Sequence, residues 1–332
     1  MNSISSPFPV NAFTSTEYHL QLSTVTGFFQ QDDNATDPDR FDYASSNLGL
    51  INRTYPSDLL FDPTGTKTQW QRFEHFVRKL DANPGNSVHY KVLFVGRHGE
   101  GYHNVAEAFY GTPAWNCYWS KLDGNGTITW SDAHLTPTGI KQALNTNAFW
   151  RHALSEAKIP APEAYYTSPL DRCVATANLT YADLPLPHSC PFRPIVKELL
   201  REALGVHTCD RRSTRSAIRA AHPSVTFEPG FPEQDPLWVP ELRESTSHHT
   251  ERLRALLRNI FATEPGMFVA LSSHSGSIAA MLRALGHRPF PLQTGGVIAV
   301  LVRADRAPGP APVVPVDPPV PAPDCGSGVV QK

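Results

Sequence analysis

Short apolar runs and longer amphipathic stretches alternate along the chain from Tyr90 onward. The apolar runs have the length and composition of buried strands, and loops connect them to stretches whose apolar residues recur at helical spacing. This order of strand, loop and helix predicts an α/β fold with a parallel-type sheet. The predicted strands are YKVLFV, AYYT, FVALSS and VIAVLV, and we expect the last to close the sheet.

Helix start signals support the same order. Thr136 has the side chain of an N-cap, and Pro137 follows it at the first helical position of a stretch that continues for several turns. Ser168 and Pro169 give the same signal after the AYYT strand. No internal repeat is evident, so the sequence predicts one α/β domain with loop insertions.

The two flanks of this domain have a different composition. Residues 1–88 are rich in polar and turn-forming types and contain one helical stretch, TQWQRFEHFVRKL, so we expect an N-terminal extension that packs on the core. The α/β domain is expected over residues 89–306. Proline is dense in residues 307–332, which excludes a helix or a central strand and predicts a disordered tail. A ligand for a proline-recognising domain is the alternative for this tail.

Composition and charge narrow the class of protein. With 40% apolar residues, 18% charged residues and a net charge of −2, the chain is typical of a globular protein without a global attraction to nucleic acid or membranes. The first residues have no basic region and no unbroken apolar stretch, so we do not expect them to act as a secretory signal, and we expect no segment that spans a bilayer. The five cysteines are odd in number and lack C-x-x-C spacing, which argues against a disulfide framework or a zinc ribbon and favours a reducing cytoplasm.

Candidate chemistry lies where predicted strands end. His98 directly follows YKVLFVGR, and His274 follows FVALSS, so both rings reach one crevice if these strands are neighbours. Arg97 precedes the first histidine, and Arg172 lies in another strand-to-helix loop. Arginine is suited to phosphate because its planar guanidinium donates paired hydrogen bonds and keeps its charge. The four side chains therefore predict a site for a phosphoryl group.

Phosphoryl transfer needs a nucleophile, a group that stabilises charge and a general acid, and the sequence offers a candidate for each. A neutral His98 imidazole can attack phosphorus as a covalent nucleophile, and His274, kept protonated by the anion, would stabilise developing charge. The departing alkoxide needs a proton, for which a carboxylic acid with a raised pKa is suited, and Glu202 is the candidate.

The sequence also resembles a known family. Arg97-His98-Gly99, with Asn104 after it, is similar to the RHG signature of the histidine phosphatase superfamily. The run from Ser168 to Arg172, followed by Thr176, resembles the family's second arginine motif, and His274-Ser275-Gly276 resembles its second histidine motif. The stretch GRHGEGYHNVAEAFYG is most similar to the fungal and yeast phosphomutase-like branch.

This resemblance, over about residues 90–305, has implications for fold and site. It implies a three-layer, doubly wound, mostly parallel sheet of the phosphoglycerate mutase-like type, with residues 89–306 as the catalytic domain. It implies that His98 becomes phosphohistidine, that Arg97, Arg172 and Asn104 bind phosphate or hold the nucleophile loop, and that His274 is the second pocket histidine. No cofactor and no metal ion are expected, since the histidines lack tight ligand spacing.

Several residue assignments stay open. Arg211 or Arg212 is an alternative for the substrate side of the pocket, and the tryptophan-containing insertion NCYWSKLDGNGTITWSDAHL either walls the pocket or packs. His103 and the pair His248-His249 are interpreted as surface or packing residues.

The sequence favours a metal-independent phosphatase that hydrolyses a small organic phosphomonoester. A phosphoglycerate-mutase-like phosphotransferase is the first alternative, and a biosynthetic enzyme that uses the same pocket on a substrate without phosphate is the second. A non-catalytic binding protein is the third. Neither the leaving group nor the oligomeric state can be read from the sequence.

Overall fold

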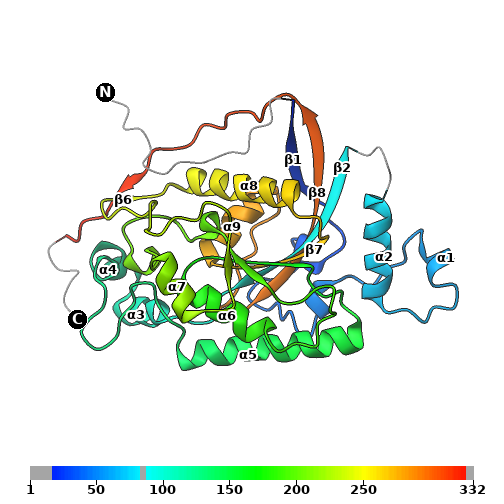
Figure 1. Cartoon of the computed structure of the whole chain (residues 1–332), viewed down its shortest axis with the longest axis horizontal. Helices are drawn as coiled ribbons and strands as arrows, with labels where there is room; N and C mark the ends of the chain where they lie inside the picture. Colours follow the sequence, from blue (N-terminus) through cyan, green and yellow to red (C-terminus); the bar gives the residue numbers. More distant parts are fainter. Residues whose placement is uncertain (1–16, 83–86, 327–332) are drawn as a thin grey trace.

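A computed structural model describes residues 17–82 and 87–326, so residues 1–16 of the predicted extension and 327–332 of the predicted tail lie outside the described residues. Seven strands form one sheet in the order β1-β8-β2-β7-β3-β4-β5 (Figure 1). The strands from β2 to β5 in this order are parallel, whereas β8 is antiparallel to both β2 and β1. The predicted α/β fold with a mostly parallel sheet is confirmed. The strands are β1 (Tyr18–Thr24), β2 (Val88–Arg97), β3 (Ala164–Thr167), β4 (Pro194–Val196), β5 (Thr226–Phe227), β7 (Phe268–Ser273) and β8 (Val297–Pro308).

Helices cover both faces of the sheet, which gives three layers (Figure 1). Helices α8 (Thr246–Thr263) and α9 (Ser275–Ala284) cover one face, and α2 (Gln69–Asp81), α5 (Pro137–His152) and α6 (Asp171–Tyr181) cover the other. Among the described residues, none of the helices combines the length and apolar composition that a bilayer crossing requires. Shorter helices lie in the connections: α1 (Asp58–Phe61), α3 (Tyr102–Tyr110), α4 (Thr112–Cys117), α7 (Arg215–Ala221), η1 (Gln30–Asp32), η2 (Asn47–Gly49), η3 (Trp119–Lys121), η4 (Ala153–Ala157), η5 (Glu198–Leu200) and η6 (Thr208–Asp210).

The alternation of side chains along β2 explains the two layers of core. Leu93 and Val95 belong to the core under α8 and α9, whereas Val92 and Phe94 belong to the core with α2 and α5. Successive side chains of a strand point to opposite faces, so a strand that is apolar at every position needs cover on both sides. The ring of Phe94 meets Trp150 of α5 edge-on at 4.9 Å.

The edge of the sheet differs from the expectation that VIAVLV closes it. This segment forms β8, which lies inside the sheet between β1 and β2. Strand β1 comes from the N-terminal extension and pairs with β8 from Tyr18↔Pro308 to Thr24↔Val302. Leu20 and Leu22 are buried while Gln21 and Ser23 are exposed, the alternation of an edge strand that is covered on one face.

The proline-rich tail is ordered over residues 307–326, so the prediction of disorder is wrong for this part. Residues Val320–Pro321 form β9, which pairs with β6 (Leu242–Arg243), and Ala322 N donates to Glu241 O at 2.9 Å. Asp317 binds Ser247 Oγ, which lies in the first turn of α8, at 2.7 Å. Proline removes backbone donors, so a proline-rich chain can lie along a surface with few hydrogen bonds to satisfy.

The cysteines form one disulfide rather than a framework of several, and the sequence analysis did not predict it. Cys117 at the end of α4 and Cys325 in the tail form a disulfide across a sequence separation of 208 residues. Cys173, Cys190 and Cys209 are free, so the odd count leaves room for one bond. The expectation of a reducing compartment rested on the absence of such a bond, and that premise fails.

Candidate active site

The two predicted histidines meet at the carboxyl ends of neighbouring strands. Strands β2 and β7 are parallel with Arg97 paired to Ser273, and His98 N donates to Ser273 O at 3.0 Å. The His98 and His274 rings, both buried, lie with their centroids 5.2 Å apart. The two rings thus lie side by side, as predicted, although His98 lines the cavity described below and His274 does not.

The backbone around His98 fixes the state of its ring. Nδ1 lies 2.7 Å from the carbonyl oxygen of Gly99. Because that oxygen only accepts, Nδ1 carries the proton and Nε2 keeps its lone pair. Burial, followed by the charges of Arg172 and Arg97, holds the pKa of His98 well below its usual value. The ring is therefore a neutral imidazole with Nε2 available as a nucleophile.

The loop after His98 is held by close backbone packing. Gly99 N donates to Thr176 Oγ1 of α6 at 3.0 Å. A Cβ on Gly99 would overlap the carbonyl oxygen of Gly139, and a Cβ on Gly139 would overlap that of Glu100. The first turn of α5 thus contacts the nucleophile loop backbone to backbone, which is possible only without side chains.

Arg97 and Arg172 reach the same cavity, whose volume is about 180 Å³. Arg97 Nη1 donates to Leu292 O at 2.7 Å, and Arg172 Nη1 donates to Cys209 O at 2.6 Å. The Nε atoms of both guanidinium groups are buried and have no hydrogen-bond partner among the described residues. A buried, unpaired cationic donor is costly, so an anion in the cavity would satisfy both. The cavity is lined by Arg97, His98, His103, Asn104, Glu107, Trp115, Asn116, Arg172, Glu202, His207, Cys209, Asp210, Arg243 and Ser275.

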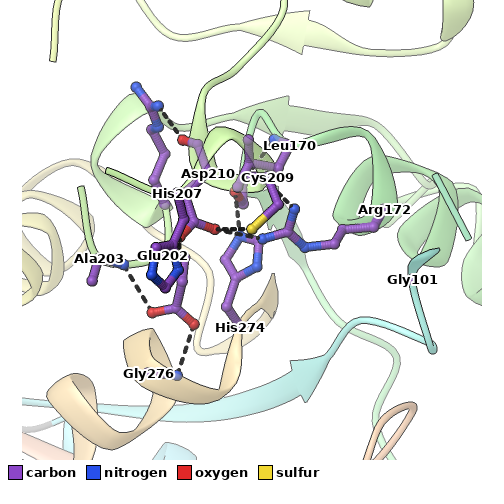
Figure 2. Close-up of polar contacts among 12 residues, drawn as sticks. Gly101, Leu170, Arg172, Glu202, Ala203, His207, Cys209, Asp210, His274 and Gly276 are labelled. Carbon is purple, nitrogen blue, oxygen red and sulfur yellow. Dashed lines mark hydrogen bonds and ion pairs between the residues drawn. The ribbon is translucent and has the colours of Figure 1, made fainter. Parts of the chain in front are cut away.

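Glu202 lies in this cavity next to the N-terminus of α9. Its carboxylate accepts from Ala203 N at 2.8 Å and from Gly276 N at 2.9 Å (Figure 2). Burial raises the pKa of Glu202, and the negative charge of Asp210 raises it further. A carboxyl group with these surroundings can hold a proton and release it to a substrate.

His274 and Asn104 occupy the positions predicted for them around the nucleophile. His274 Nε2 lies 2.7 Å from Ser168 Oγ. Burial and then Arg172 hold the pKa of His274 well below its usual value, so the protein groups alone favour the neutral ring, and its expected protonation requires a bound dianion. Asn104 Oδ1 accepts from Gly101 N at 3.0 Å and ties the start of α3 to the His98 loop.

Asp210 and Arg243 are cavity residues that the sequence analysis missed. Asp210 accepts hydrogen bonds from Arg172 and Arg243 on its two oxygens. Arg243 lies in the two-residue strand β6, and Asp210 lies in the 3₁₀ turn η6. Neither residue follows a long apolar strand, which is the pattern that located His98 and His274 in the sequence. The sequence analysis instead considered the two arginines that follow Asp210, Arg211 and Arg212.

Those two arginines do not line the cavity, so the suggestion that one of them does is wrong. Arg211 Nη2 binds Asp123 at 2.7 Å near the surface, and the buried Arg212 Nε binds Glu198 at 2.8 Å. Arg243 takes the place that was suggested for them.

The three histidines that were interpreted as surface or packing residues differ in their location. His103 is buried, its ring centroid is 5.3 Å from that of His98, and it lines the cavity, a location the sequence interpretation did not give it. His248 and His249 pack inside α8 as expected, against Glu244 and Ser277.

The aromatic residues of the insertion pack, which is one of the two roles proposed for it. Trp119 and Trp130 belong to a small core together with Trp115, which lies just before the insertion. Trp115 and Asn116, the first residue of the insertion, also line the cavity.

Among residues 17–82 and 87–326, one group of side chains has potential metal ligands, and it fits a cation poorly. His207, Cys209 and Asp210 offer ligand atoms within 4.8 Å of one another. Both oxygens of Asp210 already accept from arginine, and burial followed by the Asp210 charge raises the pKa of the Cys209 thiol. A metal ion would have to displace two guanidinium groups and deprotonate this thiol.

Comparison with known proteins assigns the family. The sequence profile of the Histidine phosphatase superfamily (branch 1) matches residues 93–295, a span that contains both pocket histidines. The chain belongs to this superfamily, and the resemblance noted from its motifs is confirmed.

Fungal relatives share most of its length. It is 54% identical to a "Probable phosphoglycerate mutase" of Arthroderma benhamiae over 87% of this chain and 86% of that one. It is 36% identical to "Phosphomutase-like protein 3" of Candida albicans over 73% and 72% of the two chains. It is 33% identical to "Probable phosphoglycerate mutase PMU1" of Saccharomyces cerevisiae over 70% of this chain and 84% of that one.

Proposed function

We propose that this protein is a phosphatase that hydrolyses a small organic phosphomonoester through a phosphohistidine at His98, with arginine in place of a metal ion. The observation that carries the proposal is the neutral His98 ring. Its Nδ1 is hydrogen-bonded to Gly99 O, and the ring stands in a cavity where the buried Nε atoms of Arg97 and Arg172 have no partner among the described residues. Two cationic donors beside one nucleophile suit a phosphate dianion.

In the first half-reaction, His98 Nε2 attacks phosphorus in line with the leaving oxygen. The new bond joins nitrogen to phosphorus, the ester P–O bond breaks, and the Glu202 carboxyl proton goes to the departing alkoxide. Arg97 and Arg172 bind the non-bridging oxygens. His274, protonated when the dianion is bound, stabilises the negative charge that develops on the phosphoryl group. The products are an alcohol and phosphohistidine.

In the second half-reaction, the Glu202 carboxylate takes a proton from water. The water oxygen then attacks phosphorus, the P–N bond breaks, and inorganic phosphate leaves with His98 again neutral. The Glu202 carboxyl is thereby protonated for the next cycle.

A phosphoglycerate-mutase-like phosphotransferase is the second candidate, because the relative at 54% identity is named a probable phosphoglycerate mutase. It would use the same phosphohistidine but pass the phosphoryl group to a hydroxyl of the bound product instead of water. The two functions therefore differ only in the second half-reaction.

Labelling the nucleophile tests the proposal. Wild-type protein mixed with a ³²P-labelled phosphomonoester panel and quenched should carry an acid-labile, base-stable label, and His98→Ala should carry none. Phosphate release by His98→Ala should fall by about 10³-fold or more. The exposed His188→Ala is the matched control and should behave as wild type.

Three outcomes would count against it. Undiminished turnover by His98→Ala would refute the nucleophile, and transfer of label to an added alcohol product in preference to water would assign the mutase. Activity on a phosphate-free compound without any labelled histidine would assign the biosynthetic alternative.

A further inference from the structure

The C-terminal segment of residues 309–326, called the strap below, contacts two elements, α4 and β6, that contribute side chains to the cavity. It leaves β8, passes α8, and reaches the end of the molecule that carries β6 and α4 (Figure 1). There Val320 pairs with Arg243, and Cys325 is bonded to Cys117. Lys121 Nζ, four residues beyond Cys117, donates to Pro323 O at 2.7 Å.

The two elements that the strap joins supply the side chains of one half of the cavity. Helix α4 supplies Trp115 and Asn116, directly before Cys117. Strand β6 supplies Arg243, whose hydrogen bonds within the described residues use Nη1 only, to Gly205 O and Asp210. An indole, an amide and a guanidinium with two further nitrogens are groups that recognise the organic part of a substrate.

The other half of the cavity is held mainly by the core of the domain. His98, which follows the central strand β2, and Arg172, in the first turn of α6, line this half, and the ring of His274 adjoins that of His98. These three side chains are 2%, 0% and 1% exposed for His98, His274 and Arg172, so the surrounding core fixes them. The two halves meet at Asp210, which accepts from both Arg172 and Arg243.

Hydrogen bonds hold the strap at separate points. Asp317 bonds with Ser245 and Ser247 at the start of α8, and Pro323 accepts from Lys121. Strand β9 has only two residues, and prolines remove many backbone donors along the segment. So short a surface pairing opens readily in solution. The bond to Cys117 is the covalent tie between the strap and α4, and it adds to these contacts in setting the spacing between α4 and β6.

We propose that the strap and its Cys117–Cys325 disulfide act as a positioning device that sets the leaving-group half of the cavity, formed by Trp115, Asn116 and Arg243, and so determines which phosphomonoesters are accepted. This inference rests on the proposed phosphatase function. Cys117 and Cys325 are positioning residues, since they act through the side chains on α4 and β6.

The test compares wild type, Cys325→Ser, Lys121→Ala and the control Cys190→Ser, which removes a free cysteine. Wild type is also measured after a dithiol reductant has supplied two electrons and two protons to give two thiols. The probes are glucose 6-phosphate, adenosine 5′-monophosphate and farnesyl phosphate, with orthovanadate as a probe of the phosphate half alone.

Opening the disulfide should change selectivity and leave phosphate binding unchanged. In Cys325→Ser and in reduced wild type, the ratio of kcat/KM between the best and the other substrates should change by about 5-fold or more, mostly through KM. Lys121→Ala should give a smaller change in the same direction, and the Kd of orthovanadate should stay within about 2-fold. Cys190→Ser should match wild type. Equal losses on every substrate together with weaker vanadate binding would indicate general destabilisation and overturn the proposal.

Hydrogen exchange separates failure of the strap from failure of the phosphatase. In Cys325→Ser, the backbone amides of α4 and β6 should exchange faster than in wild type, whereas the exchange rates of β2 and β7 should be unchanged. Unchanged exchange at α4 and β6 would refute the strap even if the enzyme turns over. No labelled histidine in wild type, with faster exchange at α4 and β6, would refute the phosphatase while the strap stands.

Discussion

Arg172 and Arg243 share one carboxylate. Asp210 Oδ1 accepts from Arg172 Nη2 at 3.0 Å, and Asp210 Oδ2 accepts from Arg243 Nη1 at 2.9 Å. Burial opposes ionisation of Asp210, but Arg243 and Arg172 outweigh it and hold the pKa of this carboxyl below its usual value. One ionised group therefore orients both arginines, for which we propose phosphate binding (Arg172) and leaving-group recognition (Arg243).

Asp210→Asn should weaken both functions of this pair. Loss of the charged acceptor frees Arg172 to adopt other rotamers, and kcat/KM should fall by about 10- to 100-fold. Because the Asp210 charge also raises the pKa of Glu202, the alkaline limb of the pH profile should move to lower pH. Steady-state kinetics across pH checks both effects.

The exposed Asp123→Asn is the control for this substitution, since Asp123 pairs with Arg211 outside the cavity. It should leave kcat/KM and the pH profile unchanged. An alkaline limb that stays in place in Asp210→Asn would contradict the electrostatic link to Glu202.

Because the pKa of Glu202 is raised, we expect activity to fall as pH rises. Burial and the Asp210 charge raise its pKa, so the protonated acid is present below that raised pKa and is lost as pH passes through it. Glu202→Gln should lower kcat/KM, which reports the first half-reaction, by about 10²- to 10⁴-fold on alkyl phosphates and less on p-nitrophenyl phosphate, whose leaving group departs without a proton. An equal loss on both substrates would remove Glu202 from the role of general acid.

Gly99→Ala should disable the site without unfolding the sheet. The added Cβ would overlap Gly139 O, so the loop that carries His98 must move, and misplacement by about 1 Å costs about 10²-fold in rate. Gly96→Ala is the matched control, because a Cβ there would meet its nearest atoms at 3.7 and 3.9 Å. Turnover and near-UV circular dichroism check the pair, and wild-type turnover in Gly99→Ala would show that the loop accommodates a side chain.

Glu244 predicts sensitivity to acid. Burial opposes its ionisation, but Arg252, with Nη2–Oε2 at 2.6 Å, and then His248 hold the pKa of Glu244 well below its usual range. A depressed carboxyl pKa stabilises the fold above the unfolded value of about 4.3, and this stability is lost as pH falls toward the folded value.

Glu244→Gln should therefore lower the free energy of unfolding by about 3 kcal/mol at pH 7 and flatten its dependence on acid pH. Asp37→Asn, at an exposed pair with Arg40, should change it by less than about 1 kcal/mol. Urea unfolding from pH 4 to pH 7 measures both, and equal values for the two variants would contradict a structural role of the buried pair.

Sequence patterns predicted the parts of this protein that local rules govern. His98 and His274 could be placed together because each follows an apolar strand and parallel strands end at one edge of a sheet. Glu202, Arg97, Arg172 and the three-layer fold came from the same logic and from the motifs. The pattern also predicted packing for His248 and His249.

The parts that were missed depend on contacts between distant segments. Arg243 and Asp210 lie in short irregular elements, so nothing local shows that they meet. Cys117 and Cys325 are 208 residues apart and share no spacing signal. The composition of the strap predicts disorder, and only its partners on β6, α4 and α8 explain why residues 307–326 have a fixed place.

The contact between Gly99 and Gly139 has a consequence for how such an enzyme diverges. Any mutation at either glycine introduces a side chain where two backbones touch, so the region beside the nucleophile has almost no room for variation. A change of substrate preference is therefore expected to require substitutions elsewhere around the cavity, at residues such as Asn116 or Arg243, where no backbone contact of this kind is made.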